Sequence, residues 1–392
     1  MNHGSWNIIS AADNAAFSRT GDAGTDLANG ILSNTHLRVS DRRMRGRGAG
    51  VNPSGRFEAF SRTDIDDGWQ SLDELPAFKT DVTVERAKTI ITKNTSPDIS
   101  FDQSVNPYRG CEHGCVYCFA RPSHTYSGLS AGLDFESKLF VKPDAARLLE
   151  KEITRPGYQV KPIAIGTNTD PYQPIERDWL VMRSLLEVLE KYNHPVGIVT
   201  KSALVTRDID ILSRMAAKGL VKVAMSITTL DRTLARTMEP RCSSPSKRLE
   251  ALKQLSEAGI PTSVMVAPVI PGLNDHELER ILDSAFAMGA REAGYVLLRL
   301  PLEVAPVFKE WLLRHYPERY RHVMSLIRSM RGGKDYDANW NKRMTGVGPY
   351  AWQISRRIEM TCKRLGMNTS RHKLRSDLFQ NPKPASEQLC LL

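Results

Sequence analysis

The sequence predicts an α/β protein built around a partial (β/α)6 barrel, and three observations lead to this prediction. Between residues 96 and 300, short apolar runs rich in β-branched residues alternate with longer amphipathic stretches. Gly219, Gly259 and Gly289 each follow such a stretch, as glycines do at helix ends. Alternating strands and helices form parallel sheets with right-handed crossovers. Six units make an incomplete TIM-like barrel, in which ligands bind at the carboxyl ends of the strands.

The expected elements can be placed in order along the chain. Strands are predicted at 99–105, 162–167, 196–200, 221–228, 262–269 and 293–300. Helices are predicted between them at 179–192, 208–218, 247–258 and 275–288, and after them at 306–316, 317–330 and 350–365. Between the last two helices, glycines, cations and aromatic residues alternate. This mixture suits stacking on nucleic-acid bases, a lid over the barrel or an ordinary loop.

Composition divides the remainder of the chain. Residues 1–95 show no sustained period and are expected to be a flexible Arg/Gly-rich extension, followed by the barrel at 96–300. Residues 301–378 are predicted to be a basic helical region and 379–392 a flexible tail. In the extension, an Arg-rich run precedes Gly48 and suits either close approach to a partner's backbone or a solvated basic arm; its members are Arg42, Arg43, Arg45 and Arg47.

The charge distribution and the N-terminal residues indicate which partners and which cellular location to expect. The formal net charge is +10, and residues 301–392 hold 17 Lys and Arg against 8 Asp and Glu. Such a surplus attracts nucleic acid, although a solvated basic surface has the same composition. The N-terminus has no basic start followed by an apolar stretch, and no apolar run is long enough to span a membrane. We therefore expect a cytoplasmic protein with no membrane partner, which also agrees with the clustered cysteines.

The most informative motif is a group of three cysteines. Cys111, Cys115 and Cys118 are separated by three and then two residues, and the next cysteine is Cys242. Cysteine thiolates hold iron–sulfur clusters. Three of them leave one iron of a [4Fe–4S] cluster open to a ligand from outside. A zinc site completed by His113 or His124 is the alternative, but the second cysteine pair that normally completes such a site is missing.

The segment from Asn106 to Arg121, with this cysteine spacing, resembles the cluster loop of the radical S-adenosylmethionine (SAM) superfamily. It is similar to the branch that includes spore photoproduct lyase, and the Arg-Gly-Arg-Gly-Ala word resembles one bacterial subgroup of that branch. The resemblance implies an enzyme with two cofactors, a [4Fe–4S] cluster and SAM, and an unidentified electron donor. Reductive cleavage of SAM would give a 5′-deoxyadenosyl radical that abstracts hydrogen from the substrate.

The resemblance also assigns SAM contacts, all at predicted strand ends. Asn168, Thr169 and Asp170 stand where the superfamily usually has Gly-Gly-Glu, and would bind the methionine amino group unless they form an Asx turn. Arg248 would pair with the methionine carboxylate, or lie on a helix surface. Tyr117 would pack on adenine, or form a wall of the cluster pocket.

Two further strand ends complete the predicted SAM site. Ser226 and Thr228 alternate toward one face, where they would contact ribose or be satisfied by backbone. Pro271 and Gly272 resemble the turn whose backbone reads adenine. The alternative is a Pro-Gly turn that starts a helix capped by Asp275.

The substrate is less well defined. The resemblance suggests lyase-like repair of a thymine lesion in DNA, but the lyase has a hydrogen-donating cysteine ahead of its fourth strand and this chain has none between Cys118 and Cys242. We expect Cys242, like Cys362, to be a small buried thiol away from the lumen. The end of the chain, Gln388 to Leu392, resembles peptides that dock on the replication sliding clamp, unless it folds onto its own domain. A nucleic-acid-binding protein with a structural zinc or iron–sulfur site is the alternative function.

Overall fold

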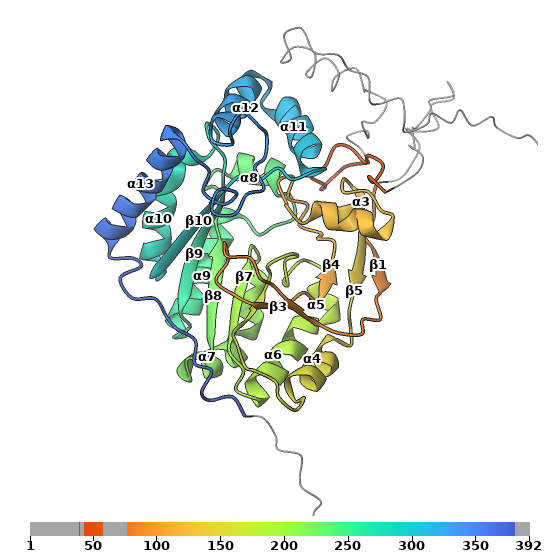
Figure 1. The fold of residues 1–392 in the computed structure, drawn as a ribbon, viewed down its shortest axis with the longest axis vertical. Helices are drawn as coiled ribbons and strands as arrows, with labels where there is room; N and C mark the ends of the chain where they lie inside the picture. The colour runs from red at the N-terminus through yellow and green to blue at the C-terminus, as the bar shows by residue number, and fades with distance from the viewer. Residues whose placement is uncertain (1–38, 40–42, 58–76, 381–392) are drawn as a thin grey trace, which may run out of the picture.

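The computed structural model describes residues 39, 43–57 and 77–380 and is built on a seven-stranded sheet (Figure 1). The strand order is β10-β9-β8-β7-β6-β3-β2. Only the edge strand β2 (Ile91–Lys93) runs antiparallel to its neighbour. The six parallel strands are β3 (Gln103–Val105), β6 (Ile163–Ile165), β7 (Val196–Thr200), β8 (Val221–Ser226), β9 (Thr262–Val269) and β10 (Glu292–Leu297). The predicted α/β class and all six expected strands are confirmed.

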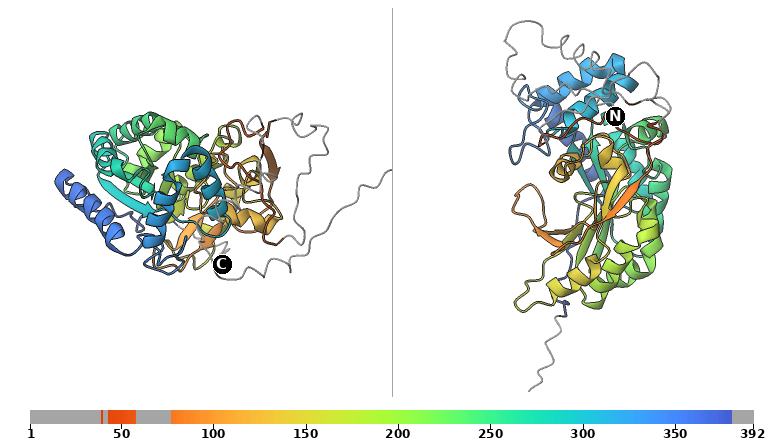
Figure 2. Two further views of the ribbon diagram at one scale, coloured as in Figure 1. Left: turned by 90° about the horizontal axis from the view of Figure 1, so that it is seen from above. Right: turned by 90° about the vertical axis from the view of Figure 1, so that its right-hand side faces the viewer.

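Helices connect the strands and cover the sheet (Figures 1 and 2). Each predicted helix between strands is present: α6 (Val181–Lys191), α7 (Ile209–Ala217), α9 (Pro245–Glu257) and α10 (Leu278–Ala287). Their apolar faces are buried, as an amphipathic helix against a sheet requires. The sequence analysis missed α4 (Ala145–Ile153) and α8 (Arg232–Met238).

The core lies between this helical layer and the parallel strands. In β7, burial alternates along the strand, so Val196, Ile198 and Thr200 are buried while the residues between them are partly exposed. Ile198 packs in the same core as Val223 and Val264 of the next two strands. Each fully buried Val or Ile contributes about 1.5–3 kcal/mol to folding. This packing fixes where each strand ends, and therefore where the loops that follow the strands begin.

A second, smaller sheet escaped sequence prediction. It joins β1 (Asp81–Val84), β5 (Lys138–Val141) and β4 (Tyr108–Arg109), with β5 parallel to β1 and antiparallel to β4. Strand β4 leads directly into the cysteine loop, so this sheet fixes the start of that loop. β1 and β2 lie before residue 96, within the region assigned to the extension. The proposed division of the chain into regions stays a prediction.

Residues 43–57 run across the cysteine loop, and we call them the N-terminal strap. Arg47 donates from Nη1 to the carbonyl oxygen of Glu136 (2.5 Å) and from Nη2 to that of Phe78 (3.1 Å). Leu133 donates its N–H to the carbonyl of Val51 (3.3 Å). The backbone that Arg47 approaches is therefore that of its own chain. Arg42 of the Arg-rich run lies outside the described residues.

The C-terminal region contains the three expected helices. They are α11 (Val304–His315), α12 (Tyr320–Ser329) and α13 (Pro349–Leu365), and α13 packs against α10 (Figure 1). The segment before α13 folds as a loop against the end of β10, where Leu297 donates to the carbonyl of Met344 (2.8 Å). Among residues 39, 43–57 and 77–380, no helix has the length and apolarity needed to cross a membrane. The segment from Gln388 to Leu392 lies outside the described residues.

Candidate active site

The cysteine loop leaves β4 and turns twice within eight residues. Cys111 donates its N–H to the carbonyl of Phe135 (2.9 Å), and Gly114 donates to that of Cys111 (3.3 Å). Cys118 then donates to the carbonyl of Cys115 (3.2 Å). Cys111 and Cys115 are buried and Cys118 is partly exposed. The loop therefore gathers three thiols at the carboxyl-terminal side of the parallel sheet.

A buried ion pair beneath the loop holds it in place. Arg121 donates to the carbonyl oxygens of Cys115 (2.9 Å) and Gly114 (3.3 Å), and its Nη2 pairs with Glu136 Oε1 at 2.5 Å. Neither side chain of this pair is exposed. The Glu136 carboxylate also accepts the N–H groups of two strap residues, Gly48 (2.8 Å) and Ala49 (2.9 Å). Loop and strap are thus joined through one carboxylate.

The thiols have the chemistry of a metal-binding set. Burial raises the pKa of Cys118 to about 12, and the thiolates of Cys115 and Cys111 act in the same direction. The contact with Cys242 lowers the pKa of Cys115 to about 7. Three thiolates in one loop repel one another unless cations lie between them, so the set fits the irons of a [4Fe–4S] cluster. Cys111, Cys115 and Cys118 would hold that cluster.

The two histidines considered as zinc ligands occupy different places. His124 lies with Nε2 2.9 Å from the carbonyl oxygen of Lys138 and packs on Phe135, so it does not complete a zinc site with the cysteines. His113 is buried, with Nδ1 3.4 Å from Asp170 Oδ2. Although burial works to lower it, Asp170 and Cys111 raise the pKa of His113. His113 is thus a charged neighbour of the first cysteine.

The residues after β6 that were expected to bind the amino group of SAM already make hydrogen bonds within the protein. Asp170 accepts the N–H of Tyr172 (2.9 Å), which is the Asx turn left open as an alternative, and also the Thr200 hydroxyl (2.7 Å) and the Lys201 N–H (2.7 Å). Although burial opposes it, His113 and these hydrogen bonds lower the pKa of Asp170 to about 2. The carboxylate therefore ties the ends of β6 and β7 together.

Asn168 and Thr169 also bond to backbone or neighbouring side chains. The Asn168 N–H donates to Asn106 Oδ1 (3.2 Å), and the buried Thr169 hydroxyl donates to the carbonyl of Tyr108 (3.0 Å). These bonds fix the loop after β6 against the residues that lead into the cysteine loop. Binding of an ammonium group by Asn168, Thr169 and Asp170 stays a prediction, and such a group would share acceptors that are already occupied.

Arg248 is buried in the barrel, so the helix-surface alternative for it is wrong. Its Nη2 pairs with Glu239 Oε1 at 2.5 Å, and its Nη1 donates to the carbonyl of Ser226 (3.1 Å). Glu239 also accepts the Tyr117 hydroxyl and, at 3.3 Å, that of Thr228. Tyr117, Thr228 and Arg248, predicted from three separate parts of the sequence, thus meet on one carboxylate that the sequence analysis did not select.

Lys201 is a further site residue that was not predicted from the sequence. It directly follows β7 and is partly buried, and its Nζ donates to Ser226 Oγ (3.0 Å) and lies 5.7 Å from the centre of the Tyr117 ring. Although burial opposes it, Cys115 and Glu239 raise the pKa of Lys201. Within the described part of the chain, no ion pair joins Lys201 to a carboxylate. The available signal was a lysine immediately after a predicted strand.

The turn after β9 contains the expected Pro-Gly pair, but Asp275 does not cap the short helical turn that follows, whose N-cap position is Asn274. Gly272 has φ +71, a conformation that glycine adopts at little cost, and its N–H donates to Asp275 Oδ1 (3.0 Å). Asn274 donates from Nδ2 to the carbonyl of Thr228 (2.8 Å), which ties the turn to the end of β8. Contact of Pro271 and Gly272 with adenine stays a prediction.

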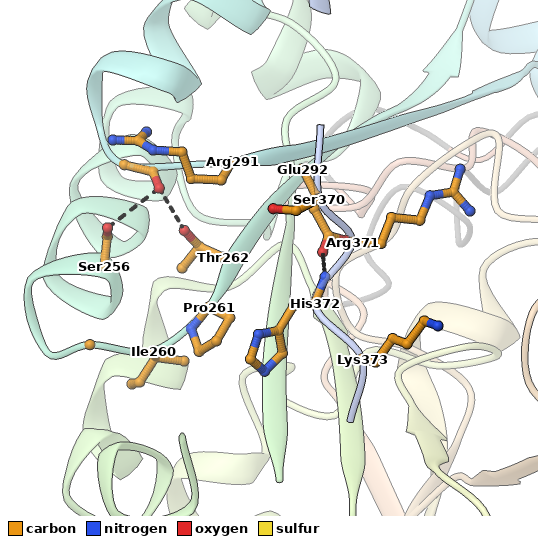
Figure 3. Close-up of a pocket in the computed structure, with 12 residues that line it drawn as sticks. Ser256, Ile260, Pro261, Thr262, Arg291, Glu292, Ser370, Arg371, His372 and Lys373 are labelled. Carbon is orange, nitrogen blue, oxygen red and sulfur yellow. Dashed lines mark hydrogen bonds between the residues drawn. The ribbon is translucent and has the colours of Figure 1, made fainter. Parts of the chain in front are cut away.

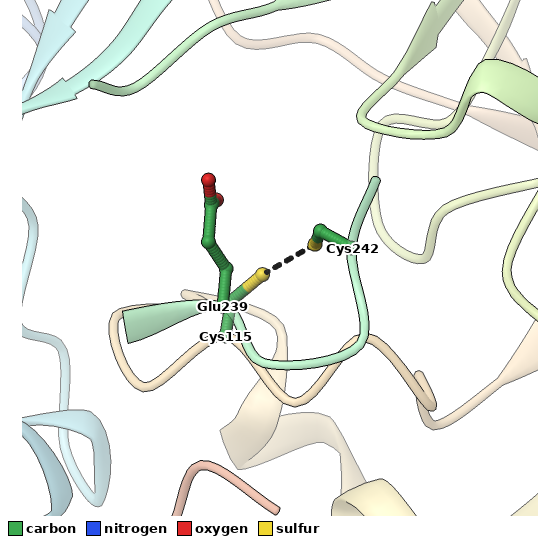
Figure 4. A group of neighbouring side chains, drawn as sticks. All are labelled: Cys115, Glu239 and Cys242. Carbon is green, nitrogen blue, oxygen red and sulfur yellow. Dashed lines mark hydrogen bonds between the residues drawn. The ribbon is translucent and has the colours of Figure 1, made fainter. Parts of the chain in front are cut away.

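Cys242 lies at the site, contrary to the expectation that it is a thiol away from the lumen. Its Sγ is 3.7 Å from Sγ of Cys115, and the two sulfurs point toward each other (Figure 4). The loop after α8 carries it there, since Val116 donates to the carbonyl of Met238 (3.1 Å). Cys362 is buried in α13, as expected.

A surface groove of about 510 Å³ lies elsewhere (Figure 3). It is lined by residues at the starts of β9 and β10, including Thr262 and Glu292, and by the segment around His372, whose N–H donates to Glu292 Oε1 (2.6 Å). These are the amino ends of the strands, whereas ligands of such barrels bind at the carboxyl ends. The groove is therefore separate from the cysteine site.

Comparison with known proteins agrees with this geometry. The family model of the radical SAM superfamily matches residues 105–285. An uncharacterised protein of Mycobacterium tuberculosis is 37% identical over 230 residues, which cover 57% of this chain and 68% of that protein. A radical SAM Nalpha-GlyT isomerase of Pseudomonas phage M6 is 23% identical over 233 residues, or 58% of this chain and 46% of the isomerase.

Among solved structures, spore photoproduct lyase complexed with dinucleoside spore photoproduct aligns with a TM-score of 0.49 and 19% identity. The alignment covers 72% of this chain and 78% of the lyase. The matched family segment begins at the end of β3 and contains the cysteine loop and the ends of β6, β7 and β8, where the buried site lies. The chain belongs to the radical SAM superfamily and is an enzyme whose cofactors are a [4Fe–4S] cluster and SAM.

Proposed function

We propose that this radical SAM enzyme abstracts a hydrogen atom from a nucleic-acid substrate. The cluster, when bound by Cys111, Cys115 and Cys118, supplies the electron that cleaves SAM. The chain's own residues bind and orient SAM beside the cysteine loop and keep water away from the radical. An electron donor is required; its identity, the reaction class and the cytoplasmic location stay predictions.

The surroundings of Lys201 give the main support for the proposed SAM site. Lys201 is a partly buried cation at a strand end, it has no carboxylate partner among the described residues, and Cys115 is close enough to raise its pKa. A SAM carboxylate would pair with it through a charge-assisted hydrogen bond. Arg248 is less suited to this role than expected, because Glu239 already pairs with it. Tyr117 and Thr228 would then line the SAM site.

An exposed aromatic residue that lies on a partly buried cation beside the cysteine loop supports a nucleic-acid substrate. Phe119 follows Cys118 and is 44% exposed. The Arg299 guanidinium lies 4.9 Å from the centre of the Phe119 ring and donates to the Tyr336 hydroxyl (3.5 Å). Stacking surfaces next to cations are what single-stranded nucleic acid binds. The positive surplus after residue 300 acts in the same direction.

Lyase-like DNA repair receives less support. A thiol that returns hydrogen to a product radical must face the substrate, whereas Cys242 faces the sulfur of Cys115. Repair activity and docking on a sliding clamp through Gln388 to Leu392 therefore stay predictions. The substrate class is proposed, and the bond changed in the substrate is left open.

Isotope transfer tests this proposal. The reconstituted enzyme would be incubated without oxygen with SAM, dithionite and deuterated or unlabelled DNA or RNA, and 5′-deoxyadenosine analysed by mass spectrometry. We expect deuterium in the product only with labelled nucleic acid. Phe119→Ala and Arg299→Gln should lower the incorporation, while Arg147→Gln, on the exposed face of α4, should not. The proposed substrate would be contradicted if 5′-deoxyadenosine stayed unlabelled with deuterated nucleic acid and formed equally fast when nucleic acid was left out.

A further inference from the structure

We infer that Cys115, Cys242 and Glu239 form a second metal site, which binds one divalent transition-metal ion when the [4Fe–4S] cluster is absent. The three side chains come from two parts of the chain, the cysteine loop and the loop after α8 (Figure 4). This site shares Cys115 with the cluster but uses neither Cys111 nor Cys118.

The distance between the two sulfurs points to a shared ion. Sγ of Cys115 and Sγ of Cys242 are 3.7 Å apart. Two thiolates bound to one tetrahedral ion at about 2.3 Å each are separated by about 3.8 Å. A carboxylate oxygen of Glu239 lies within 4.8 Å of both sulfurs. Small side-chain rotations would therefore bring three ligand atoms onto one ion, and water would complete the tetrahedron.

The groups around these ligands resemble the outer shell of a metal site. Arg248 and Tyr117 hydrogen-bond to the Glu239 carboxylate, as partners of metal-bound carboxylates commonly do. Two thiolates and one carboxylate around a divalent ion leave one negative charge. The buried Arg248 and the partly buried Lys201 are cations beside that charge. The surroundings thus compensate the charge of the loaded site.

The ligand types select the metal. Two soft thiolates with one carboxylate favour Zn²⁺ or Fe²⁺ over Mg²⁺ or Ca²⁺. Binding requires both cysteines as thiolates and releases the protons that they still carry, with no change in oxidation state. Because Cys115 serves both centres, an ion at this site must leave, or give up Cys115, before the three-cysteine cluster is complete. The site therefore competes with cluster assembly.

Cobalt is the probe that tests this site. Reduced, cluster-free protein would be titrated with Co²⁺ without oxygen, following thiolate-to-cobalt charge-transfer absorption and the d–d bands of tetrahedral cobalt. We expect one equivalent to bind. Cys242→Ala should weaken binding at least about 100-fold, the upper end of the loss caused by removing an outer-shell partner. Cys118→Ala should retain both affinity and spectrum.

Cluster reconstitution gives the reciprocal control. Cys242→Ala should assemble a [4Fe–4S] cluster and cleave SAM, whereas Cys118→Ala should do neither. SAM cleavage therefore reports on the proposed function, and cobalt binding reports separately on this metal site. Retained cluster assembly also shows that Cys242→Ala folds. Wild-type cobalt affinity and spectrum in Cys242→Ala, or loss of cobalt binding in Cys118→Ala, would overturn the inference.

Discussion

Lys201 shows how one partly buried charge can define a ligand site. Removing an ammonium group from water is costly unless it is paired, and here its partners are a serine hydroxyl and an aromatic face. Negative groups nearby raise its pKa, so it stays cationic. A ligand carboxylate would complete its pairing. The residue is thus better explained by a bound anion than by stability of the ligand-free protein.

Lys201→Met should therefore weaken SAM binding. Hydrogen bonds to charged groups contribute about 1.5–3 kcal/mol, which corresponds to a rise in the KM for SAM of about tenfold to hundredfold. The measurement is the rate of 5′-deoxyadenosine formation against SAM concentration. Lys222→Met is the control, because Lys222 lies on β8 and pairs with Glu292 at 3.5 Å. An unchanged KM in Lys201→Met would contradict the assignment.

At the residue scale, local spacing was predictable and distant contacts were not. The three cysteines could be identified because they lie within eight residues. Cys242 follows Cys115 by 127 positions, and only the path of the loop after α8 brings the two sulfurs together. Glu239 could likewise not be predicted as the partner of Arg248, because a salt bridge between a loop and a helix produces no periodic pattern in the sequence.

The cysteine loop and the N-terminal strap act as one structural element. Glu136 accepts hydrogen bonds from Gly48 and Ala49 and pairs with Arg121, which in turn holds the carbonyl groups of the loop. A Cβ added at Gly48 would lie 1.9 Å from the carbonyl oxygen of Gly114. The close approach of the two backbones therefore explains why the second glycine of the Arg-Gly-Arg-Gly-Ala motif, Gly48, is a glycine.

Glu136→Gln should destabilise this element. Removing one charge of a fully buried pair leaves the other uncompensated and costs about 3–5 kcal/mol of unfolding free energy. Chemical denaturation of the cluster-free protein measures it. The matched control is Glu359→Gln, whose exposed pair with Arg356 is worth at most about 1 kcal/mol. Equal stability of the two variants would show that the buried pair does not hold the strap.

Gly48→Ala should loosen the strap from the loop. The added methyl group cannot be accommodated without moving backbone, because the atom it meets is a carbonyl oxygen. Overpacking of this kind costs about 1–3 kcal/mol. The cluster of the variant should be lost faster in air, followed by its absorbance. Gly197→Ala is the control, since a Cβ there meets nothing within 4 Å; equal decay rates would count against the strap.

Elements with strong periodicity were predictable, and short ones were not. Strands at 196–200 and 262–269 were predicted at the bounds the structure shows, because in each strand buried β-branched residues alternate with partly exposed residues. Strands β4 and β1 have two and four residues, too few for an alternating pattern, and their sheet depends on pairing with β5. The sequence therefore predicted the six parallel strands of the large sheet and missed its edge strand β2 and the small sheet.

On the scale of the whole molecule, the carboxyl ends and the amino ends of the parallel strands have different surroundings. The carboxyl ends lie beside the cysteines and the buried charges, while at the amino ends the C-terminal segment packs beside β7 and lines the surface groove beside β9 and β10. There His194 is buried between Tyr158, whose hydroxyl lies 2.9 Å from its Nε2, and the ring of Phe379. Burial lowers the pKa of His194 to about 4, so the ring is neutral in the folded protein.

Stability should consequently fall in mild acid. Between pH 6.5 and about 4 the unfolded chain binds a proton at His194 that the folded protein does not, so the unfolding free energy decreases by about 1.4 kcal/mol per pH unit, about 3 kcal/mol in all. Denaturation of cluster-free protein across this range measures the slope. His194→Gln should remove this contribution, and His276→Gln, at an exposed position, should not. An identical slope in His194→Gln would contradict it.

The most direct test of the central claim is SAM cleavage itself. The protein would be reconstituted with iron and sulfide without oxygen, reduced with dithionite, and assayed for 5′-deoxyadenosine alongside Cys118→Ala and Cys362→Ala. The account predicts product from the wild type and from Cys362→Ala, whose thiol is buried in α13, and none from Cys118→Ala. No product from a wild-type protein with a full cluster, or undiminished product from Cys118→Ala, would contradict it.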